Sequence, residues 1–226
     1  MRILIVAATR LEIAPIVADL RHTGTVNPRI GTYRHAHHDV DVLTTGVGMV
    51  ATAVWCGERL CREPYDLALN LGVCGTFVQT LPPAGVVHVV SDLFAELGAE
   101  DGDRFVPLEE MGLLGPDDFP FTGGRIVNAA PPPNPVLEAL PRVAGVTVNT
   151  VHGDEASIAR IVGRLHPDVE SMEGAAFMYA CRAHGVPFAQ VRAVSNVVER
   201  RNRAAWKMPD AIARLGRTAL DILDAQ

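Results

Sequence analysis

The fold of this chain is constrained most strongly by a regular alternation of short apolar runs with helical patterns. Buried strands read as short runs of apolar and β-branched residues, whereas helices place apolar residues at every third or fourth position. Alternation of the two is typical of a largely parallel sheet whose faces are both covered by helices. The sequence therefore predicts an α/β fold in three layers, α/β/α, around a central mixed, largely parallel and twisted sheet.

Six runs have the character of strands. They cover residues 2–8, 40–45, 67–71, 86–91, 146–151 and 188–195. Helices are predicted over residues 12–20, 50–61, 155–165, 172–184 and 204–223. The fourth helix has a clear end, because Gly185 is followed by Val186 and Pro187, and proline cannot continue a helix.

Length and composition favour one domain. At 226 residues and 48% hydrophobic content, the chain can bury one substantial core, so we expect a single domain over residues 1–226. Residues 97–135 differ from the rest, being rich in glycine, proline and acidic residues. Because long loops of this kind are often functional, we expect this excursion to run over the ligand-binding edge of the sheet.

Charge and hydropathy limit the classes of partner. The net charge of -6 gives no basic face for nucleic acid, and no stretch approaches the roughly 18 apolar residues of a membrane span. The apolar run at residues 3–8 is too short for the core of an export signal. We therefore expect a cytoplasmic protein that acts on a small molecule.

Cysteine and histidine spacing indicates neither a disulfide nor a metal site. The four cysteines are Cys56, Cys61, Cys74 and Cys181. They lack the spacing of metal ligands and suit reduced, buried thiols. The histidine cluster consists of His35, His37 and His38, followed by Asp39. Its alternating positions face opposite sides of a strand-like segment, so they cannot converge on one ion.

Polar residues follow or close several predicted strands, where open α/β sheets bind small molecules. Asn196 ends the apolar run 191–196, just before a charged loop, and either reads a polar edge of a ligand or caps the next turn. Glu12 follows the first strand and either serves a ligand or complements the dipole of its helix. Glu173 stands at a helix start, where it either caps the helix or accepts hydrogen bonds from two vicinal sugar hydroxyls.

Two predicted strands end in glycine-rich segments, residues 44–48 and 70–75, which we interpret as turns. Glycine lets the backbone approach a ligand closely. Neither segment matches the phosphate loop or the dinucleotide fingerprint. Tight packing and ligand binding therefore both remain open for them.

Taken together, Glu12, Met172, Glu173 and Asn196 resemble the nucleoside phosphorylase and hydrolase superfamily. The resemblance covers nearly the whole chain, through the ordered segments 45–48, 70–75, 152–154, 172–173 and 192–196. Within the superfamily, the sequence is most similar to the futalosine hydrolases, in residues 170–176, in Ser195 and Asn196, and in the charged loop 199–203 with Trp206.

This resemblance implies hydrolysis of the N-glycosidic bond of futalosine, with release of hypoxanthine, in menaquinone biosynthesis. It implies neither cofactor nor metal. By resemblance, Glu12 orients and deprotonates the attacking water, Glu173 holds the ribose hydroxyls, Met172 lies under the sugar and Asn196 stabilises the departing purine. Further substrate contacts implied by the resemblance are Gly46, Val73, Cys74, Gly75, Ala156, Ser157, Ser171, Ser195 and Arg203.

The resemblance also implies a homodimer or higher homo-oligomer, in which a neighbour's loop closes the pocket. The carboxylated aromatic arm of futalosine calls for a cation, and Arg201 and Arg203 are the candidates unless they form a solvated basic loop. Trp206, Phe94 and Phe105 are available for contact with the aromatic ring.

Two departures from the wider superfamily narrow the function. The adenine-specific nucleosidases carry Asp where this chain has Asn196, and an amide can donate to the N7 and O6 acceptors of a 6-oxopurine. The phosphorylases hold phosphate with Arg and Ser, where this chain has Asn70 and Val73. Hydrolysis is therefore favoured over phosphorolysis.

Three alternatives remain open from the sequence. Two are enzymes, a methylthioadenosine/S-adenosylhomocysteine nucleosidase and an inosine-type phosphorylase. The third is a protein that binds a purine nucleoside without turnover. Glu12 counts against the third, since a pure binder has no need of a carboxylate that activates water.

Overall fold

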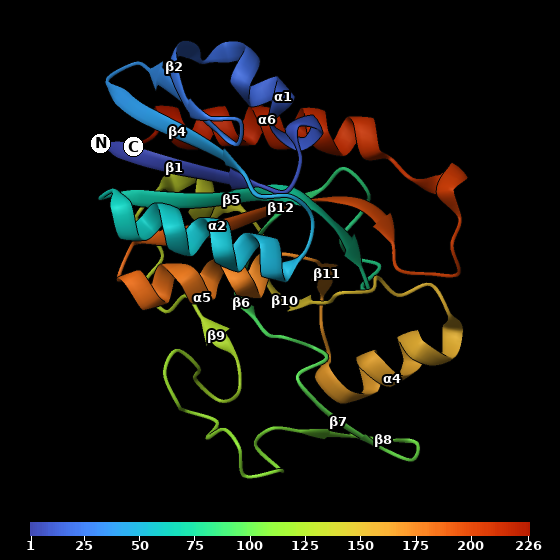
Figure 1. Ribbon diagram of the computed structural model, residues 1–226. Coiled ribbons are helices and arrows are strands. Elements are labelled where there is room, and N and C mark those ends of the chain that lie inside the picture. The colour runs from blue at the N-terminus through green and yellow to red at the C-terminus, as the bar shows by residue number, and fades with distance from the viewer.

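The computed structural model describes residues 1–226, in which strands and helices alternate along much of the chain (Figure 1). The strands are β1 (Arg2–Ala7), β2 (Arg21–Asn27), β3 (Ile30–His35), β4 (His38–Thr44), β5 (Leu67–Thr76), β6 (Val86–Asp92), β7 (Gly98–Asp101), β8 (Arg104–Pro107), β9 (Ile126–Val127), β10 (Arg142–Thr147), β11 (Val169–Ser171) and β12 (Phe188–Val197). The helices are α1 (Arg10–Asp19), α2 (Met49–Arg62), α3 (Pro135–Ala139), α4 (Glu155–Leu165), α5 (Gly174–His184) and α6 (Met208–Asp224), with a 3-10 turn at Arg203–Ala205.

One ten-stranded sheet forms the centre of the molecule, with the order β11-β10-β6-β12-β5-β1-β4-β3-β2 along its main path. The run from β12 through β5 and β1 to β4 is parallel, whereas β3 and β2 extend the edge as antiparallel strands. An additional pairing of β11 with β5 closes β11, β10, β6, β12 and β5 into a ring. The predicted mixed, largely parallel sheet is confirmed.

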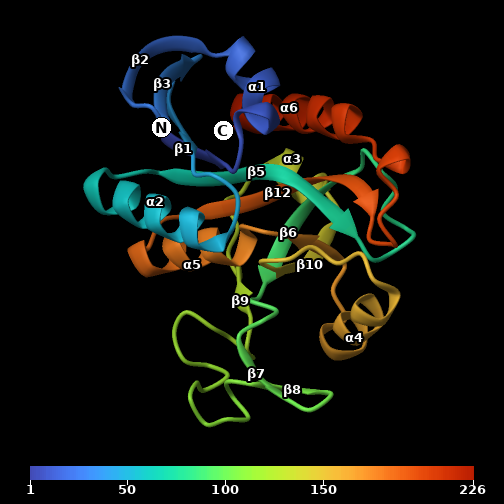
Figure 2. The same cartoon turned by 45° about the vertical axis from the view of Figure 1, so that its right-hand side comes forward.

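Helices cover both faces of this sheet. Helices α1 and α6 pack together on one face, and α2 and α5 pack together on the other (Figure 2). The side chains of β1 alternate between the two layers: Ile3 and Ile5 join the core under α1 and α6, whereas Leu4 and Val6 join the core under α2 and α5. Burial on both faces explains why this strand reads as an uninterrupted apolar run.

Several predicted elements need correction. No structure was predicted for residues 21–35, yet most of them form the edge strands β2 and β3. Strand β2 is largely exposed and polar, so it carries no apolar run. The fifth predicted strand, residues 146–151, was placed too late, because β10 ends at Thr147 and the following residues form a loop. The last helix begins at Met208 rather than at residue 204.

The glycine-rich segment 70–75 is not a turn. Strand β5 continues through it to Thr76, because β12 pairs with this stretch on one side and β11 with its end on the other. The prediction of a turn here was wrong. The glycines instead lie inside the sheet, next to side chains that need room.

The excursion at residues 97–135 does not cover the ends of β5 and β12, which corrects part of the expectation, although residues 100 and 102–105 of its hairpin line a polar cavity together with His152. It forms the hairpin β7–β8 and a loop that leads into β9. The hairpin lies next to α4, away from the ends of β5 and β12 (Figures 1 and 2). Phe105 of the hairpin packs under Arg164 of α4, with the guanidinium 3.9 Å from the ring centroid. None of the six helices combines the length and hydropathy needed to cross a bilayer.

Candidate active site

A cavity of about 360 Å³ opens at the carboxyl ends of β5 and β12, which is the size of a small-molecule site. It brings together most of the residues that the sequence singled out. Those that line it are Glu12, Val73, Cys74, Gly75, Ser171, Met172, Glu173, Ser195 and Asn196. Gly46, Ala156, Ser157 and Arg203 do not line it.

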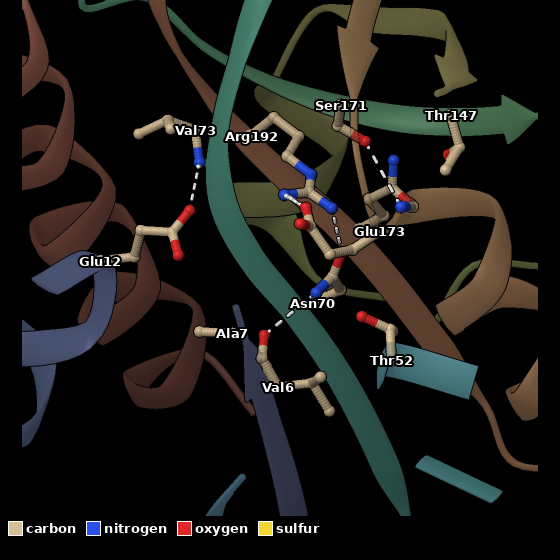
Figure 3. Close-up of polar contacts among 12 residues, drawn as sticks. Val6, Ala7, Glu12, Thr52, Asn70, Val73, Thr147, Ser171, Glu173 and Arg192 are labelled. Carbon is tan, nitrogen blue, oxygen red and sulfur yellow. Dashed lines mark hydrogen bonds and ion pairs between the residues drawn. The ribbon is translucent and has the colours of Figure 1, made fainter. Parts of the chain in front are cut away.

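Glu12 has two roles, one for each carboxylate oxygen. Thr9 is the N-cap of α1 and donates its backbone N–H and its hydroxyl to Glu12 Oε2, over 2.9 Å and 2.8 Å. The backbone N–H of Val73 donates to Oε1 over 3.1 Å, across the gap to β5 (Figure 3). The helix-related role considered from the sequence is therefore real, yet it leaves the carboxylate fixed against β5 in the cavity wall.

Glu173 does not cap its own helix. It is the N-cap residue of α5, but its side chain makes no capping hydrogen bond. Its Oε1 accepts the backbone N–H of Gly48 over 3.1 Å, and its Oε2 lies 3.5 Å from Nη1 of Arg192. The capping alternative is therefore wrong, and the buried carboxylate is aimed by the start of α2 and by a cation.

Arg192 is the main residue that the sequence analysis missed. It lies on β12 and is fully buried, with Nη2 donating to Asn70 Oδ1 over 2.5 Å, while Asn70 Nδ2 donates to the carbonyl of Val6 (Figure 3). A side chain at position 72 would collide with Nη1 of Arg192 and would lie 2.9 Å from Glu12 Oε1. Gly72 therefore lets the carboxylate and the guanidinium approach the same point of β5.

A buried polar network supports the start of α5, where Glu173 lies. Thr147 Oγ1 accepts the backbone N–H of Ala175 over 2.7 Å and donates to Asp92 Oδ1 over 3.0 Å. Gln190 donates to the other oxygen of Asp92 over 3.0 Å. Burial raises the pKa of Asp92 above its ordinary value, against the opposing effect of these hydrogen bonds. The network fixes the start of α5 against the sheet.

The thiol of Cys74 also lines the cavity, but it is unreactive. Burial raises the pKa of Cys74 to about 12, so this side chain stays protonated at neutral pH. The neighbouring charge of Arg192 opposes the shift without cancelling it. Cys74 therefore contributes shape rather than a nucleophile.

Asn196 lies on β12 at a break in the register with β5, where a bulge re-aims side chains. Its Nδ2 donates to the carbonyl of Val197 over 2.8 Å, and its Oδ1 lies 2.7 Å from the hydroxyl of Ser195. A primary amide has two N–H groups, so one N–H of Nδ2 remains for a ligand. The amide thus lies in the cavity wall and within the strand rather than in the following turn.

The pairing of Glu170 with His152 was missed as well, although both residues lie in segments that resemble the superfamily. Glu170, on β11, accepts the backbone N–H of His152 over 2.9 Å, and its Oε2 lies 2.5 Å from His152 Nδ1. Both residues line the cavity. A more polar cavity of about 580 Å³ adjoins at His152, and Ser157 lines that one. A histidine and a carboxylate 18 residues apart carry no signal of pairing until the fold is known.

The charged loop contributes one arginine to the cavity, Arg201, whose guanidinium lies 5.8 Å from the ring centroid of Trp206. Arg203 is exposed and approaches the same ring to 5.9 Å from outside the cavity. Phe94 and Phe105 do not line the cavity.

Comparison with known proteins identifies the superfamily of this chain. The chain matches the model of the phosphorylase superfamily over residues 2–225. It belongs to that superfamily. Among phosphorylase superfamily members, futalosine hydrolase from Streptomyces coelicolor is 32% identical over 229 residues, which cover 95% of this chain and 92% of the relative. Futalosine hydrolase from Acidothermus cellulolyticus is 33% identical over 215 residues, which cover 88% and 75%.

Solved structures of the superfamily confirm the fold. The native structure of futalosine hydrolase from Helicobacter pylori superimposes with a TM-score of 0.80 at 15% identity, and the match covers 100% of this chain and 98% of that one. The resemblance inferred from the sequence is therefore confirmed.

Proposed function

We propose that this protein hydrolyses the N-glycosidic bond of futalosine and releases hypoxanthine and dehypoxanthine futalosine. Two relatives with this name share about a third of its sequence over most of their length. The observation that carries the proposal is the convergence of Glu12, Glu173 and Asn196 on one cavity. Each of the three matches a step in breaking the bond between a ribose and a purine.

The ribose end of the cavity is acidic. As the glycosidic bond breaks, positive charge develops on the ribose, and nearby carboxylates stabilise it. Glu173 has one protein partner on each oxygen, which leaves lone pairs to accept the 2'- and 3'-hydroxyls. Met172 lies beside it and offers an apolar surface to the sugar.

Glu12 is the proposed general base. Its Oε2 is held by both donors of Thr9, whereas Oε1 has a single donor, the backbone of Val73. A free lone pair on Oε1 orients a water and accepts its proton as the water attacks. A base positioned in this way contributes about 10²–10⁴-fold to the rate.

Asn196 acts on the leaving group. Negative charge develops on the purine as it departs, and the remaining N–H of Asn196 donates to one of the two acceptors on that edge of hypoxanthine, N7 or O6. An amide that already holds Val197 is fixed before the substrate binds, so it needs no reorganisation during the reaction.

Charge favours water over phosphate as the nucleophile. Four carboxylates line the cavity, those of Glu12, Glu170, Glu173 and Glu199, against one arginine, Arg201. From the sequence, Asn70 and Val73 stand where the phosphorylases hold phosphate, and neither is a cation. Arg192 of β12, however, places a cation beside β5, which corrects the expectation that none is present. Arg192 is nevertheless engaged by Glu173 and by Asn70, so it offers little to a phosphate dianion.

Further parts of the proposal follow from the resemblance. Arg201 and Arg203 are the proposed partners of the carboxylated arm of futalosine, and Gly46, Ala156 and Ser157 remain proposed substrate contacts. We also propose a cytoplasmic homo-oligomer that serves menaquinone biosynthesis without a cofactor.

Product analysis tests the function. Purified protein is incubated with futalosine, methylthioadenosine and inosine, each with and without phosphate, and the released bases are separated by chromatography. We expect hypoxanthine from futalosine at equal rates with and without phosphate. Preferred release of adenine, or a requirement for phosphate, contradicts the proposal; futalosine bound tightly and recovered unchanged indicates a binding protein.

A further inference from the structure

One polar pair in the cavity takes no part in the chemistry proposed so far: His152 and Glu170. The carboxylate of Glu170 is buried, and both of its oxygens are engaged by His152, one by the backbone N–H over 2.9 Å and one by Nδ1 over 2.5 Å. The side chain of Glu170 thus adds to the backbone hydrogen bond from Val148 to Ser171 in binding the loop before α4 to β11. A carboxylate committed so fully to one histidine fixes the orientation of its ring.

The sheet places this pair opposite Asn196. Gly75 of β5 pairs with Glu170 of β11 on one side and with Asn196 of β12 on the other. The backbones of Glu170 and Asn196 are therefore two strand spacings apart, about 10 Å. Val198 Cγ2 fills the position that a side chain at residue 75 would take. Gly75, Asn196 and His152 all line the cavity, so a planar base bound there can have Asn196 at one edge and His152 at the other.

The hydrogen bond to Glu170 determines what the ring of His152 offers. An ionised carboxylate only accepts, so the proton of the neutral imidazole is on Nδ1, and Nε2 keeps its lone pair. No protein partner engages Nε2. In its neutral form, His152 therefore presents a hydrogen-bond acceptor to the cavity.

We propose that His152, oriented by Glu170, accepts a hydrogen bond from N1–H of a 6-oxopurine and so helps to select hypoxanthine over adenine. Hypoxanthine carries a proton on N1, whereas N1 of adenine is an acceptor that would face the lone pair of Nε2. N7, O6 and N1 follow one another along the purine edge, so Asn196 and His152 read its two ends. The inference rests on the proposed function, since it assumes a purine nucleoside as substrate.

Two variants of the pair test the proposal. His152→Phe keeps a ring beside Phe77 but removes the acceptor, and Glu170→Gln can donate to Nδ1 and so frees the ring to take the other tautomer. For each, kcat/KM is measured with futalosine and with its 6-amino analogue. We expect the ratio of kcat/KM for futalosine to that for the 6-amino analogue to fall at least about tenfold in His152→Phe. The same ratio should fall less in Glu170→Gln.

A matched control separates recognition from packing. Phe77→Leu changes the ring that contacts His152, with centroids 6.4 Å apart, but leaves both polar groups in place. We expect the substrate ratio to stay unchanged in this variant. The ratio is measured within one protein sample, so a partial loss of folded enzyme cancels out.

The outcomes distinguish the inference from the proposed function. Parallel loss of both substrates in His152→Phe and Glu170→Gln assigns the pair a structural role and overturns the inference, as does a selective loss of the 6-amino substrate. If the wild type releases no hypoxanthine from futalosine, the proposed function fails by itself. Calorimetric binding of free hypoxanthine and adenine then decides the inference without turnover: it stands only if His152→Phe weakens hypoxanthine selectively.

Discussion

The two ends of the cavity are built from different kinds of group. At the proposed ribose end, Glu12 and Glu173 are buried carboxylates held by backbone N–H groups of Val73 and Gly48. At the proposed purine end, the groups assigned to base recognition are the imidazole of His152 and the amide of Asn196, which is half-buried. Charge at one end suits the oxocarbenium-like state, and neutral donors and acceptors at the other suit the choice of base. Mutations should therefore separate rate from specificity.

The largest effect is expected at the ribose end, in Glu12→Gln. Glutamine can still accept the N–H of Val73, but an amide cannot take a proton from water. We expect kcat to fall at least about 100-fold with little change in substrate affinity. Steady-state kinetics together with a thermal unfolding control measure this, and near-normal turnover would remove Glu12 from the mechanism.

The next largest effect is expected in Glu173→Gln. Hydrogen bonds to a charged acceptor are the strong ones, so their loss should lower kcat/KM by about 10- to 100-fold. The control is a 2'-deoxy substrate, on which the same variant should lose less because one hydroxyl is absent. An equal loss on both substrates contradicts the assignment of Glu173 to the ribose hydroxyls.

At the purine end, Asn196→Asp should alter selectivity more than rate. A carboxylate cannot donate to N7 or O6, so the ratio of kcat/KM for futalosine to that for its 6-amino analogue should fall about tenfold or more. Parallel assays of the two substrates measure it. A ratio equal to that of the wild type removes Asn196 from base recognition.

A smaller effect is expected from the exposed arginines. Arg201→Ala should raise KM for futalosine by about two- to fivefold, because exposed ion pairs are weak, and should leave inosine unaffected because inosine lacks the carboxylated arm. Arg203→Ala should have a lesser effect, since Arg203 lies outside the cavity. If KM is unchanged in Arg203→Ala, that residue leaves the proposed site.

The smallest effect on either end is expected from His88, a buried residue of β6 outside the cavity. Burial, with the charge of Arg142, lowers the pKa of His88 to about 4. In the unfolded chain the pKa of His88 is about 6.5, so the unfolded state binds the proton before the folded state does. Protonation of His88 therefore lowers the free energy of unfolding as pH falls from about 6.5 to about 4. His88→Leu should flatten that part of the stability curve without changing the substrate ratio, as chemical denaturation at several pH values and substrate assays can show.

The sequence indicated the groups that are proposed to act on substrate, and the fold class that brings them together. Glu12 and Asn196 follow or close buried strands, and Glu173 begins a helix, so position in an α/β sheet made them candidates, and the resemblance to the superfamily selected them. The choice between their alternative interpretations required the structure. Only the structure shows that Glu12 also caps α1, whereas Glu173 leaves its own helix uncapped.

The residues that support the site, Arg192, Glu170 and His152, could not be predicted from the sequence for a different reason. Arg192 stands in an apolar run, where a charge is a signal of burial with a partner, yet Asn70 and Glu173 come from distant segments. Glu170 and His152 meet because β11 pairs with β10, the strand that precedes the loop of His152, and no local pattern encodes that pairing. The path of residues 97–135 depends on packing against α4, which composition does not determine.

The most direct test of the division between the two ends crosses two variants with two substrates. The ratio of kcat/KM for futalosine to that for its 6-amino analogue is measured in the wild type, in Glu12→Gln and in Asn196→Asp. We predict that Glu12→Gln slows both substrates and keeps the wild-type ratio, whereas Asn196→Asp shifts the ratio toward the 6-amino substrate. A shifted ratio in Glu12→Gln, or an unshifted ratio in Asn196→Asp, would contradict the account.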